Sequence, residues 1–202
     1  STWGLCRYDG VSFTTLSIPE GLPSPNVRLT LEDGNGTLWI GTNGGVAAYD
    51  GRRVVSHAGK GGALAGTVWS GAVDRHGALW FGTDRGLVSY DGEKFRTFLR
   101  ADGLADDYVY SLFPASDGSI WLGSRGQGVA RCTLEPGGRL GNCRVFTAAD
   151  GLGHDSVRAI TEDRQGTLYF ATRGGGLARF DGQSFTRLTA ADGLPDDDLY
   201  AL

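Results

Sequence analysis

The side chains that could carry chemistry are scattered thinly along this chain of 202 residues. The three histidines, His57, His76 and His154, stand in different sequence contexts, and no cysteine or carboxylate has a metal-ligand spacing to any of them. The Gly-Gly-Gly run at 174–176 lacks the Lys-Ser/Thr of a phosphate-binding loop. The sequence therefore predicts no catalytic constellation, no metal site and no cofactor, and it favours a protein that is not an enzyme.

Binding chemistry is better represented, above all by two arginines. Arg125 and Arg173 each follow an aromatic residue by four positions, after the similar segments 121–124 and 169–172. Equivalent arginines in two copies of one unit could grip a carboxylate or a sulfate through bidentate hydrogen bonds. The alternative is that they pair with neighbouring acidic loops. Which of the two applies depends on the elements that position them.

A sequence unit recurs along the chain and must supply those elements. Its clearest marker is an aromatic residue followed by a small turn, at 39–42, 80–83, 121–124 and 169–172; the aromatic residues are 41, 41 and 48 positions apart. Two further markers keep the same phase: Gly-Val/Leu leading to Tyr/Phe-Asp-Gly, and Gly-Leu before a polar loop. The pattern predicts one domain, 1–202, with repeats near 4–44, 45–85, 86–127, 128–175 and 176–202.

Each unit predicts four short antiparallel strands, here called A to D. Turns of the form Asp-x-x-Gly, as at 33–36, 74–77 and 163–166, separate strands A and B; the Asp can cap the turn while Gly adopts positive φ. Asp-Gly dipeptides such as 50–51 mark the hairpin between strands C and D. No segment has a sustained 3.6-residue apolar period, so no helix of consequence is expected.

Repeated four-stranded units are typical of an all-β fold, the β-propeller, in which each blade-shaped sheet covers its neighbour. The strand-B aromatics Trp39, Trp80, Trp121 and Tyr169 are then expected to pack between blades. Repeated Asp residues resemble calcium ligands at first sight, but single Asp residues in short turns lack the alternating oxygen ligands of a calcium loop. Turn capping is the favoured interpretation.

Both ends of the chain fall inside a repeat, at strand C and at strand A. The sequence thus predicts four full blades and a fifth split between the termini, which supply its strands A, C and D. Two alternatives stay open: a ring that closes with an incomplete blade, or a segment of a larger propeller. An incomplete blade exposes a strand edge, which offers a route to self-association.

Taken in order, these motifs resemble the two-component regulator propeller repeat. The match runs through Gly-Leu-Pro at 21–23, Glu-Asp at 32–33, Leu-Trp-Ile-Gly-Thr at 38–42 and Tyr-Asp-Gly at 49–51. The resemblance implies a sensor, because such propellers form the extracytoplasmic input regions of bacterial histidine kinases, hybrid two-component proteins or related regulators, and some sense carbohydrate. It also implies a periplasmic or extracellular location. The chain departs from the pattern at 59–66, which is rich in Gly and Ala.

Propeller topology collects the D–A and B–C loops on one face, where binding residues are expected. The candidate ligand-binding residues on these loops are Asn43, Asp84, Arg85, Arg125, Arg173, Asp107, Tyr108, His154 and Asp197. The expected partner is a small molecule, a glycan or a partner protein. The alternatives are a structural interaction or assembly module and, less favoured, a propeller lyase or glycan hydrolase, which would need clustered His and carboxylate groups at the central mouth.

The cysteines suggest an oxidising compartment. Cys132 and Cys143 flank the extra length of the 48-residue unit, in its C–D turn, so they are expected on paired strands at a distance suited to a disulfide. The alternative is two buried free thiols. Cys6 has no obvious partner and is expected to be a small core residue.

The formal net charge of −4 argues against nucleic acid or an anionic membrane as a partner, since both require a basic surface. No apolar run approaches the roughly 20 residues that span a bilayer, so direct membrane contact by this segment is not expected. The chain also starts without a signal-like segment.

Overall fold

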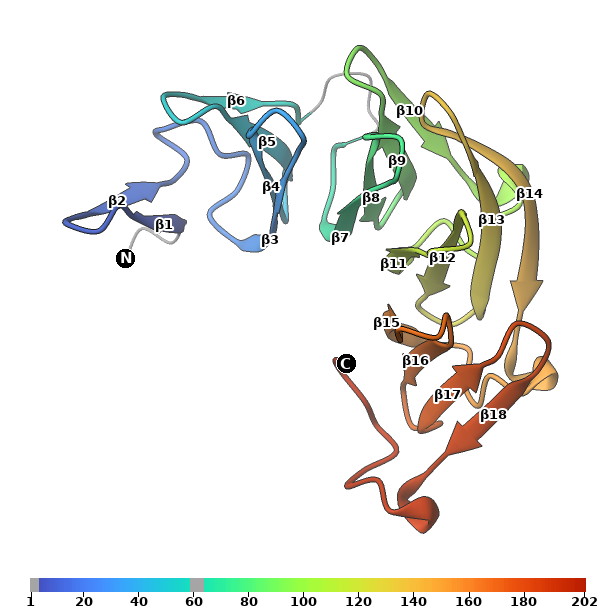
Figure 1. The fold of residues 1–202 in the computed structure, drawn as a ribbon. Coiled ribbons are helices and arrows are strands. Elements are labelled where there is room, and N and C mark those ends of the chain that lie inside the picture. Colours follow the sequence, from blue (N-terminus) through green and yellow to red (C-terminus); the bar gives the residue numbers. More distant parts are fainter. Residues whose placement is uncertain (1–3, 59–63) are drawn as a thin grey trace.

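The computed structural model describes residues 4–58 and 64–202 and is all-β (Figure 1). Four antiparallel four-stranded sheets follow one another along the chain, and each is a meander whose sequence order is its spatial order. The first sheet contains β3 (Val27–Glu32), β4 (Leu38–Thr42), β5 (Gly45–Tyr49) and β6 (Val54–Ser56). The second contains β7 (Val68–Val73), β8 (Leu79–Thr83), β9 (Gly86–Tyr90) and β10 (Phe95–Phe98).

The third sheet contains β11 (Val109–Pro114), β12 (Ser119–Ser124), β13 (Val129–Glu135) and β14 (Arg139–Phe146). The fourth contains β15 (Val157–Glu162), β16 (Leu168–Thr172), β17 (Leu177–Phe180) and β18 (Phe185–Leu188). The predicted propeller blades are confirmed, with strands A to D in chain order. Each sheet takes strands A and B from one sequence repeat and strands C and D from the next.

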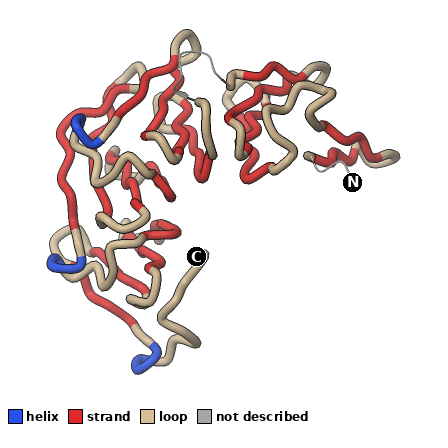
Figure 2. Tube along the Cα trace, turned by 180° about the vertical axis from the view of Figure 1, so that it is seen from behind, coloured by secondary structure: helices blue, strands red, loops and turns tan. Residues whose placement is uncertain are grey.

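The sheets stand along an open arc, with β3, β7, β11 and β15 on its inner side (Figure 1). A two-stranded sheet, β1 (Leu5–Tyr8) and β2 (Phe13–Leu16), lies at one end, and the C-terminal segment lies at the other, as the view from behind also shows (Figure 2). Strands C and D of the predicted fifth blade are thus formed by β1 and β2. Its strand A is not joined to them, because the C-terminal segment is held by the fourth sheet through an isolated bridge between Arg173 and Asp198.

Three short 3-10 turns, Arg100–Asp102, Ala148–Asp150 and Ala190–Asp192, open the D–A connections after β10, β14 and β18. The Asp that ends each turn accepts a hydrogen bond from the backbone N–H three residues earlier, and the Gly that follows has positive φ. The Asp-Gly-Leu marker of the sequence is therefore the signature of this turn.

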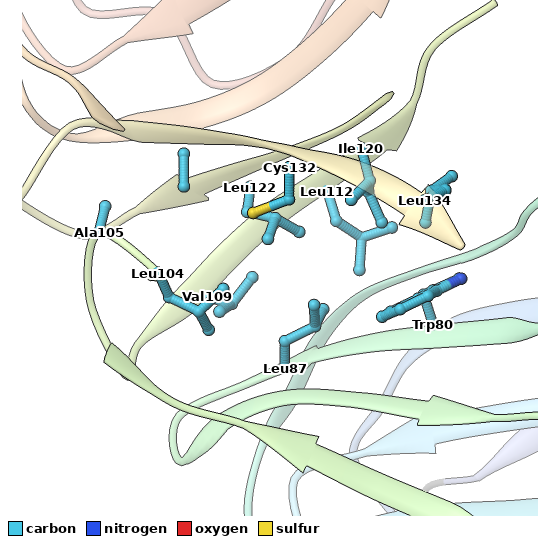
Figure 3. Packing of buried hydrophobic residues seen from close by; sticks show 11 residues of the cluster. Trp80, Leu87, Leu104, Ala105, Val109, Leu112, Ile120, Leu122, Cys132 and Leu134 are labelled. Atoms are coloured by element: carbon cyan, nitrogen blue, oxygen red, sulfur yellow. The ribbon is translucent and has the colours of Figure 1, made fainter. Parts of the chain in front are cut away.

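Aromatic residues of strand B fill the spaces between blades, as predicted. Trp80 is fully buried and packs with Leu87 of its own blade and with Leu112, Ile120 and other residues of the next (Figure 3). Trp39 and Trp121 are buried in the corresponding clusters, where Trp121 lies 5.1 Å from Phe170 between ring centroids.

Tyr169 differs, since it is only half-buried. No sheet among the described residues follows the fourth blade, so nothing comparable covers this ring. The prediction of interblade packing is therefore wrong for Tyr169 in the present arc, and its hydroxyl lies against Asp163 instead.

The A–B turns link blade geometry to these aromatic residues. In Asp33, Oδ1 accepts the backbone N–H groups of Asn35 and Thr37, while Oδ2 accepts the indole N–H of Trp39 at 2.9 Å. Burial raises the pKa of Asp33, but these hydrogen bonds outweigh it and hold the pKa below its ordinary value. Asp74 and Asp163 repeat the arrangement, so turn capping is confirmed and extends to the strand-B aromatic.

Glycines on strand B allow the next blade to approach closely. A Cβ added at Gly82 would lie 2.8 Å from the carbonyl oxygen of Val109, and one at Gly123 would lie 2.9 Å from that of Val157. Both partner residues begin strand A of the following blade. The glycine of the Trp-x-Gly-Thr/Ser marker thus fixes how tightly the inner strands pack.

The extended hairpin β13–β14 carries the extra residues of the fourth repeat. Cys132 and Cys143 are cross-strand partners and form a disulfide, with Cα atoms 4.1 Å apart. At its tip the carbonyl oxygen of Gly138 accepts a hydrogen bond from Ser89 Oγ at 2.6 Å, so the hairpin reaches back to the second blade. Cys6, by contrast, is exposed on β1, and its prediction as a core residue is wrong because a two-stranded sheet leaves that face uncovered.

Candidate functional site

A β-bulge near the start of every strand A directs one residue per blade out of the ladder. Pairing between strands A and B skips Arg28 in β3, Trp69 in β7, Tyr110 in β11 and Arg158 in β15. An unpaired bulge residue turns its side chain away from the regular pleat, and bulges are common beside binding sites. These four side chains therefore occupy equivalent positions on the inner edge of the arc.

The bulge residues form a cationic and aromatic wall, in which the first three contact one another in turn. The guanidinium of Arg28 lies 4.2 Å above the ring centre of Trp69, and Trp69 stacks on Tyr110 with centroids 5.1 Å apart. At the far end, Arg158 lies 3.8 Å from the ring centre of Tyr200. Cation–π contacts of this kind stabilise the charged arginine side chains of the wall even where no carboxylate lies beside them.

A cavity of about 440 Å³ opens on this wall and is lined by Trp69, Tyr108, Tyr110, Arg125, Ser156, Arg158 and Arg173. A second hollow of about 350 Å³ shares Trp69, Tyr110 and Arg158 and adds Arg28, so the two are neighbouring parts of one surface. We call the surface formed by these eight residues the inner wall. Its chemistry is that of a binding site for an electron-rich or planar group, because it offers guanidinium donors beside aromatic faces.

Two donors on or near the inner wall are unusually placed. Trp69 Nε1 and Ser70 Oγ are buried and have no hydrogen-bond partner among the described residues. Tyr108 is half-buried, and burial raises the pKa of its hydroxyl, so this group also remains a neutral donor at physiological pH. Buried donors without acceptors are uncommon, and here they stand beside an open cavity.

Among the predicted site residues, the structure brings Arg125, Arg173 and Tyr108 together in this cavity. Arg125 lies 5.5 Å from the ring centre of Tyr108. Neither arginine forms an ion pair within the described part of the chain, so the alternative that they pair with acidic loops is not what the structure shows.

Other predicted residues hold loops in place. Asp107 and Asp197 each accept a hydrogen bond from the backbone N–H seven residues earlier, at 2.6 and 2.7 Å, and so fasten the 3-10 turns. Asp84 accepts the backbone N–H of Thr67 at 3.1 Å, and His154 Nδ1 accepts that of Ser156 at 2.9 Å. These four side chains already have structural roles, which argues against their selection as ligand contacts.

Asn43 and Arg85 lie away from the cavity. Asn43 Oδ1 accepts a hydrogen bond from Arg28 Nε at 2.6 Å and orients that guanidinium from the side. Arg85 is exposed on the B–C loop of the second blade and is not among the lining residues. Within residues 4–58 and 64–202, no His, Cys, Asp and Glu side chains gather into a metal-binding group.

The sequence-based prediction missed Arg28, Trp69, Tyr110 and Arg158. A signal for them existed, because each follows the Val that begins strand A, at a position that holds Arg in two units, Trp in one and Tyr in one. Alternation along a strand does not by itself reveal a bulge, so the pattern did not single them out.

A larger hollow of about 760 Å³ lies between the β1–β2 sheet and the first blade, lined in part by Cys6, Thr15, Asn26 and Asn43. It exists because the β1–β2 sheet has two strands where the blades have four. The space therefore reflects the incomplete sheet, and the inner wall is the better candidate site.

The structure is an open β-propeller whose inner strands carry a cationic and aromatic surface. Three segments, 21–44, 103–126 and 151–174, match the two component regulator propeller family. The resemblance predicted from the sequence is confirmed by these three matches. No curated protein is significantly similar in sequence.

Solved structures share the fold. The chain resembles the extracellular domain of a putative hybrid two component system from B. thetaiotaomicron with a TM-score of 0.77 and 24% identity, over 96% of this chain and 26% of that one. It resembles PorZ, a surface component of the type-IX secretion system of Porphyromonas gingivalis, with a TM-score of 0.71 and 15% identity, over 98% and 33% of the two chains.

Virginiamycin B lyase from Staphylococcus aureus is also similar, with a TM-score of 0.66 and 16% identity over 94% of this chain and 63% of the lyase. The chain thus spans about a quarter to a third of the first two proteins. At these identities the likeness concerns the fold, and propellers with different roles share it. No helix among the described residues is long and apolar enough to cross a membrane.

Proposed function

We propose that the chain is a non-enzymatic ligand-binding module, the extracytoplasmic input region of a bacterial signal-transduction protein, and that it binds a small molecule or glycan on the inner wall. The observation that carries this proposal is the convergence of the four bulge residues, together with Arg125 and Arg173, on the two neighbouring hollows of the inner wall. The three segments that match the family model and the extracellular domain of like fold from a putative hybrid two component system support the sensory role and the location.

The composition of the cavity favours binding over catalysis. Its described lining consists of arginines, aromatic residues and a serine, which orient a ligand through charge, stacking and hydrogen bonds. A lyase or hydrolase would need an acid–base pair close to the substrate. His154 is the histidine nearest in sequence to a cavity-lining residue, and its Nδ1 already accepts a hydrogen bond from the backbone N–H of Ser156.

A ligand screen on matched variants tests this proposal. Thermal shift with oligosaccharides and small anions, followed by calorimetry, would compare the wild type with R125A, R173A and the control R85A. Arg85 lies on an equivalent B–C loop outside the cavity, so its loss removes the same charge without touching the site. Loss of a charged hydrogen bond of about 1.5–3 kcal/mol predicts roughly 10- to 100-fold weaker binding for R125A or R173A and little change for R85A.

Equal weakening by all three variants would reject the inner wall as the site. Failure of every ligand to stabilise the wild type would reject the sensory function itself.

The β1–β2 sheet favours a second candidate function, assembly with another copy of the chain. Val11 is 92% and Phe13 73% exposed there, and the edge of β1 away from β2 is unpaired in the described structure. Exposed apolar strands with open edges promote pairing between chains. Analytical ultracentrifugation of wild type and F13E would decide, since a dimer that dissociates in F13E supports assembly and a wild-type monomer at high concentration rejects it.

A further inference from the structure

We propose that the Asp198 carboxylate occupies an anion-binding position at Arg158 in the free chain, and that the ligand of the inner wall carries a carboxylate or sulfate that replaces it. The inference rests on the proposed function, because it specifies the charged group of the ligand that is proposed to bind in this cavity. Asp198 is then a resident competitor that sets the affinity of the site.

The contacts of Arg158 describe a guanidinium already holding an anion. Arg158 Nη1 donates to Asp198 Oδ1 at 2.8 Å and to the carbonyl oxygen of Leu199 at 3.4 Å, while the ring of Tyr200 covers one face. The Arg158 side chain is 12% exposed and that of Asp198 is 37% exposed. The arginine is thus fixed in place, whereas the carboxylate has solvent beside it into which it can turn.

The positive charges in the cavity outnumber the carboxylates that pair with them, so we expect an anion in addition to Asp198. Arg125, Arg158 and Arg173 line the same 440 Å³, and within the described residues Asp198 is the carboxylate that pairs with one of them. Two guanidinium groups remain without an ion pair in a chain whose net charge is −4. A local cluster of like charges in an acidic protein attracts anions specifically to that cluster.

An independent feature of the inner wall is a buried hydrogen-bond donor that lacks an acceptor. Trp69 lines both hollows of the inner wall, and its indole N–H is buried without a partner among the described residues. Carboxylate and sulfate oxygens are strong acceptors that can bond several donors at once. An anion in these hollows would therefore contact the unpaired arginines and lie beside a residue whose N–H lacks an acceptor.

Exchange at Arg158 needs only a side-chain rotation. The backbone around Asp198 is held by bonds from Gly176 N–H to Asp197 O at 2.9 Å and from Leu199 N–H to Thr172 O at 3.1 Å. Neither bond uses the Asp198 carboxylate, so D198N should keep the fold. Partly exposed ion pairs are weak, so the competitor is expected to reduce anion affinity only about two- to fivefold.

Titration of two probe anions tests the inference. Sodium sulfate and sodium D-glucuronate would be titrated at constant ionic strength into wild type, D198N, R158A, D198N/R158A and the control D106N. Asp106 occupies the position in the D–A loop before the third blade that Asp196 occupies in the C-terminal segment, and it forms no ion pair with an arginine of the described residues. Tighter binding of either anion by D198N, absent in D106N and lost in the double variant, supports the inference.

The outcomes separate the two proposals. Equal gains in D198N and D106N mean a general charge effect and overturn the competitor. Absence of binding by both wild type and D198N overturns the anion site, while the wider ligand screen still decides the sensory function. Binding of one probe alone supports the site and shows whether it is a carboxylate or a sulfate that it prefers.

Discussion

Replacing Asp74 with Asn isolates the hydrogen bond between the A–B turn of the second blade and its buried aromatic residue. Asp74 Oδ2 accepts the indole N–H of Trp80 at 2.8 Å, and Oδ1 accepts two backbone N–H groups. All three partners are donors. Asn offers one oxygen and one NH₂ group, so in either orientation at least one buried donor faces another donor.

The size of the effect follows from the burial of these groups. Asp74 is 5% exposed and Trp80 fully buried, so the unpaired donor costs about 1–3 kcal/mol. D74N is expected to lower the free energy of unfolding by about 2 kcal/mol. For a domain of this length that corresponds to a fall in Tm of about 4–8 °C.

Asp163→Asn is the matched control, because Asp163 bonds the Tyr169 hydroxyl at 3.0 Å in the same turn. A hydroxyl can accept as well as donate, so Tyr169 can take a hydrogen bond from the Asn NH₂. The two substitutions remove the same charge, and D163N should cost less than about 1 kcal/mol. Urea denaturation of both variants measures the difference, and equal costs for D74N and D163N would refute the donor–acceptor argument.

Three further predictions concern the same scaffold. Ala115 stands where the other blades have this Asp, and the buried indole N–H of its blade has no partner among the described residues, so A115D should add about 1 kcal/mol of stability in urea denaturation. Replacing Cys132 and Cys143 with Ala should lower the free energy of unfolding by about 3 kcal/mol, as expected for an 11-residue separation. As a control, reducing conditions should cause no further loss of stability in this double variant. The carboxyl of Asp91 has its pKa lowered, first by the backbone N–H of Lys94, and the other C–D turn carboxyls shift in the same direction. As the pH falls, these carboxyls are protonated in the unfolded chain before they are protonated in the folded one. Their contribution to the free energy of unfolding should therefore be full above about pH 4 and be lost as the pH drops through the folded-state pKa values. Unchanged urea midpoints from about pH 7 to pH 3 would contradict this.

Features with a local cause could be predicted from the sequence. Asp50-Gly51 and Asp33-x-x-Gly36 specify their turns through side-chain and φ preferences that act within four residues, and both turns are present. The four blades follow because such turns separate short apolar runs at a fixed spacing.

The candidate site was predicted only in part, because it depends on contacts and strand pairings that short sequence patterns do not show. Asp107 and Asp197 stand in loops and looked available, yet their partners lie seven residues earlier. Trp69 and Arg158 were not predicted, because alternation along a strand does not reveal the bulge that turns them to the inner wall. Arg125 and Arg173 were found because equivalent loop positions in a propeller share one face.

The bulges on the inner strands have a consequence for how such a protein can change. A residue that the ladder skips contributes no backbone pairing, so its replacement leaves the neighbouring register, as at Val109 and Ser111, intact. If the proposed function holds, each blade carries one position whose mutation would alter recognition with little effect on folding. Ligand preference could drift blade by blade during evolution, or be rewritten by design, while the architecture that presents it stays unchanged.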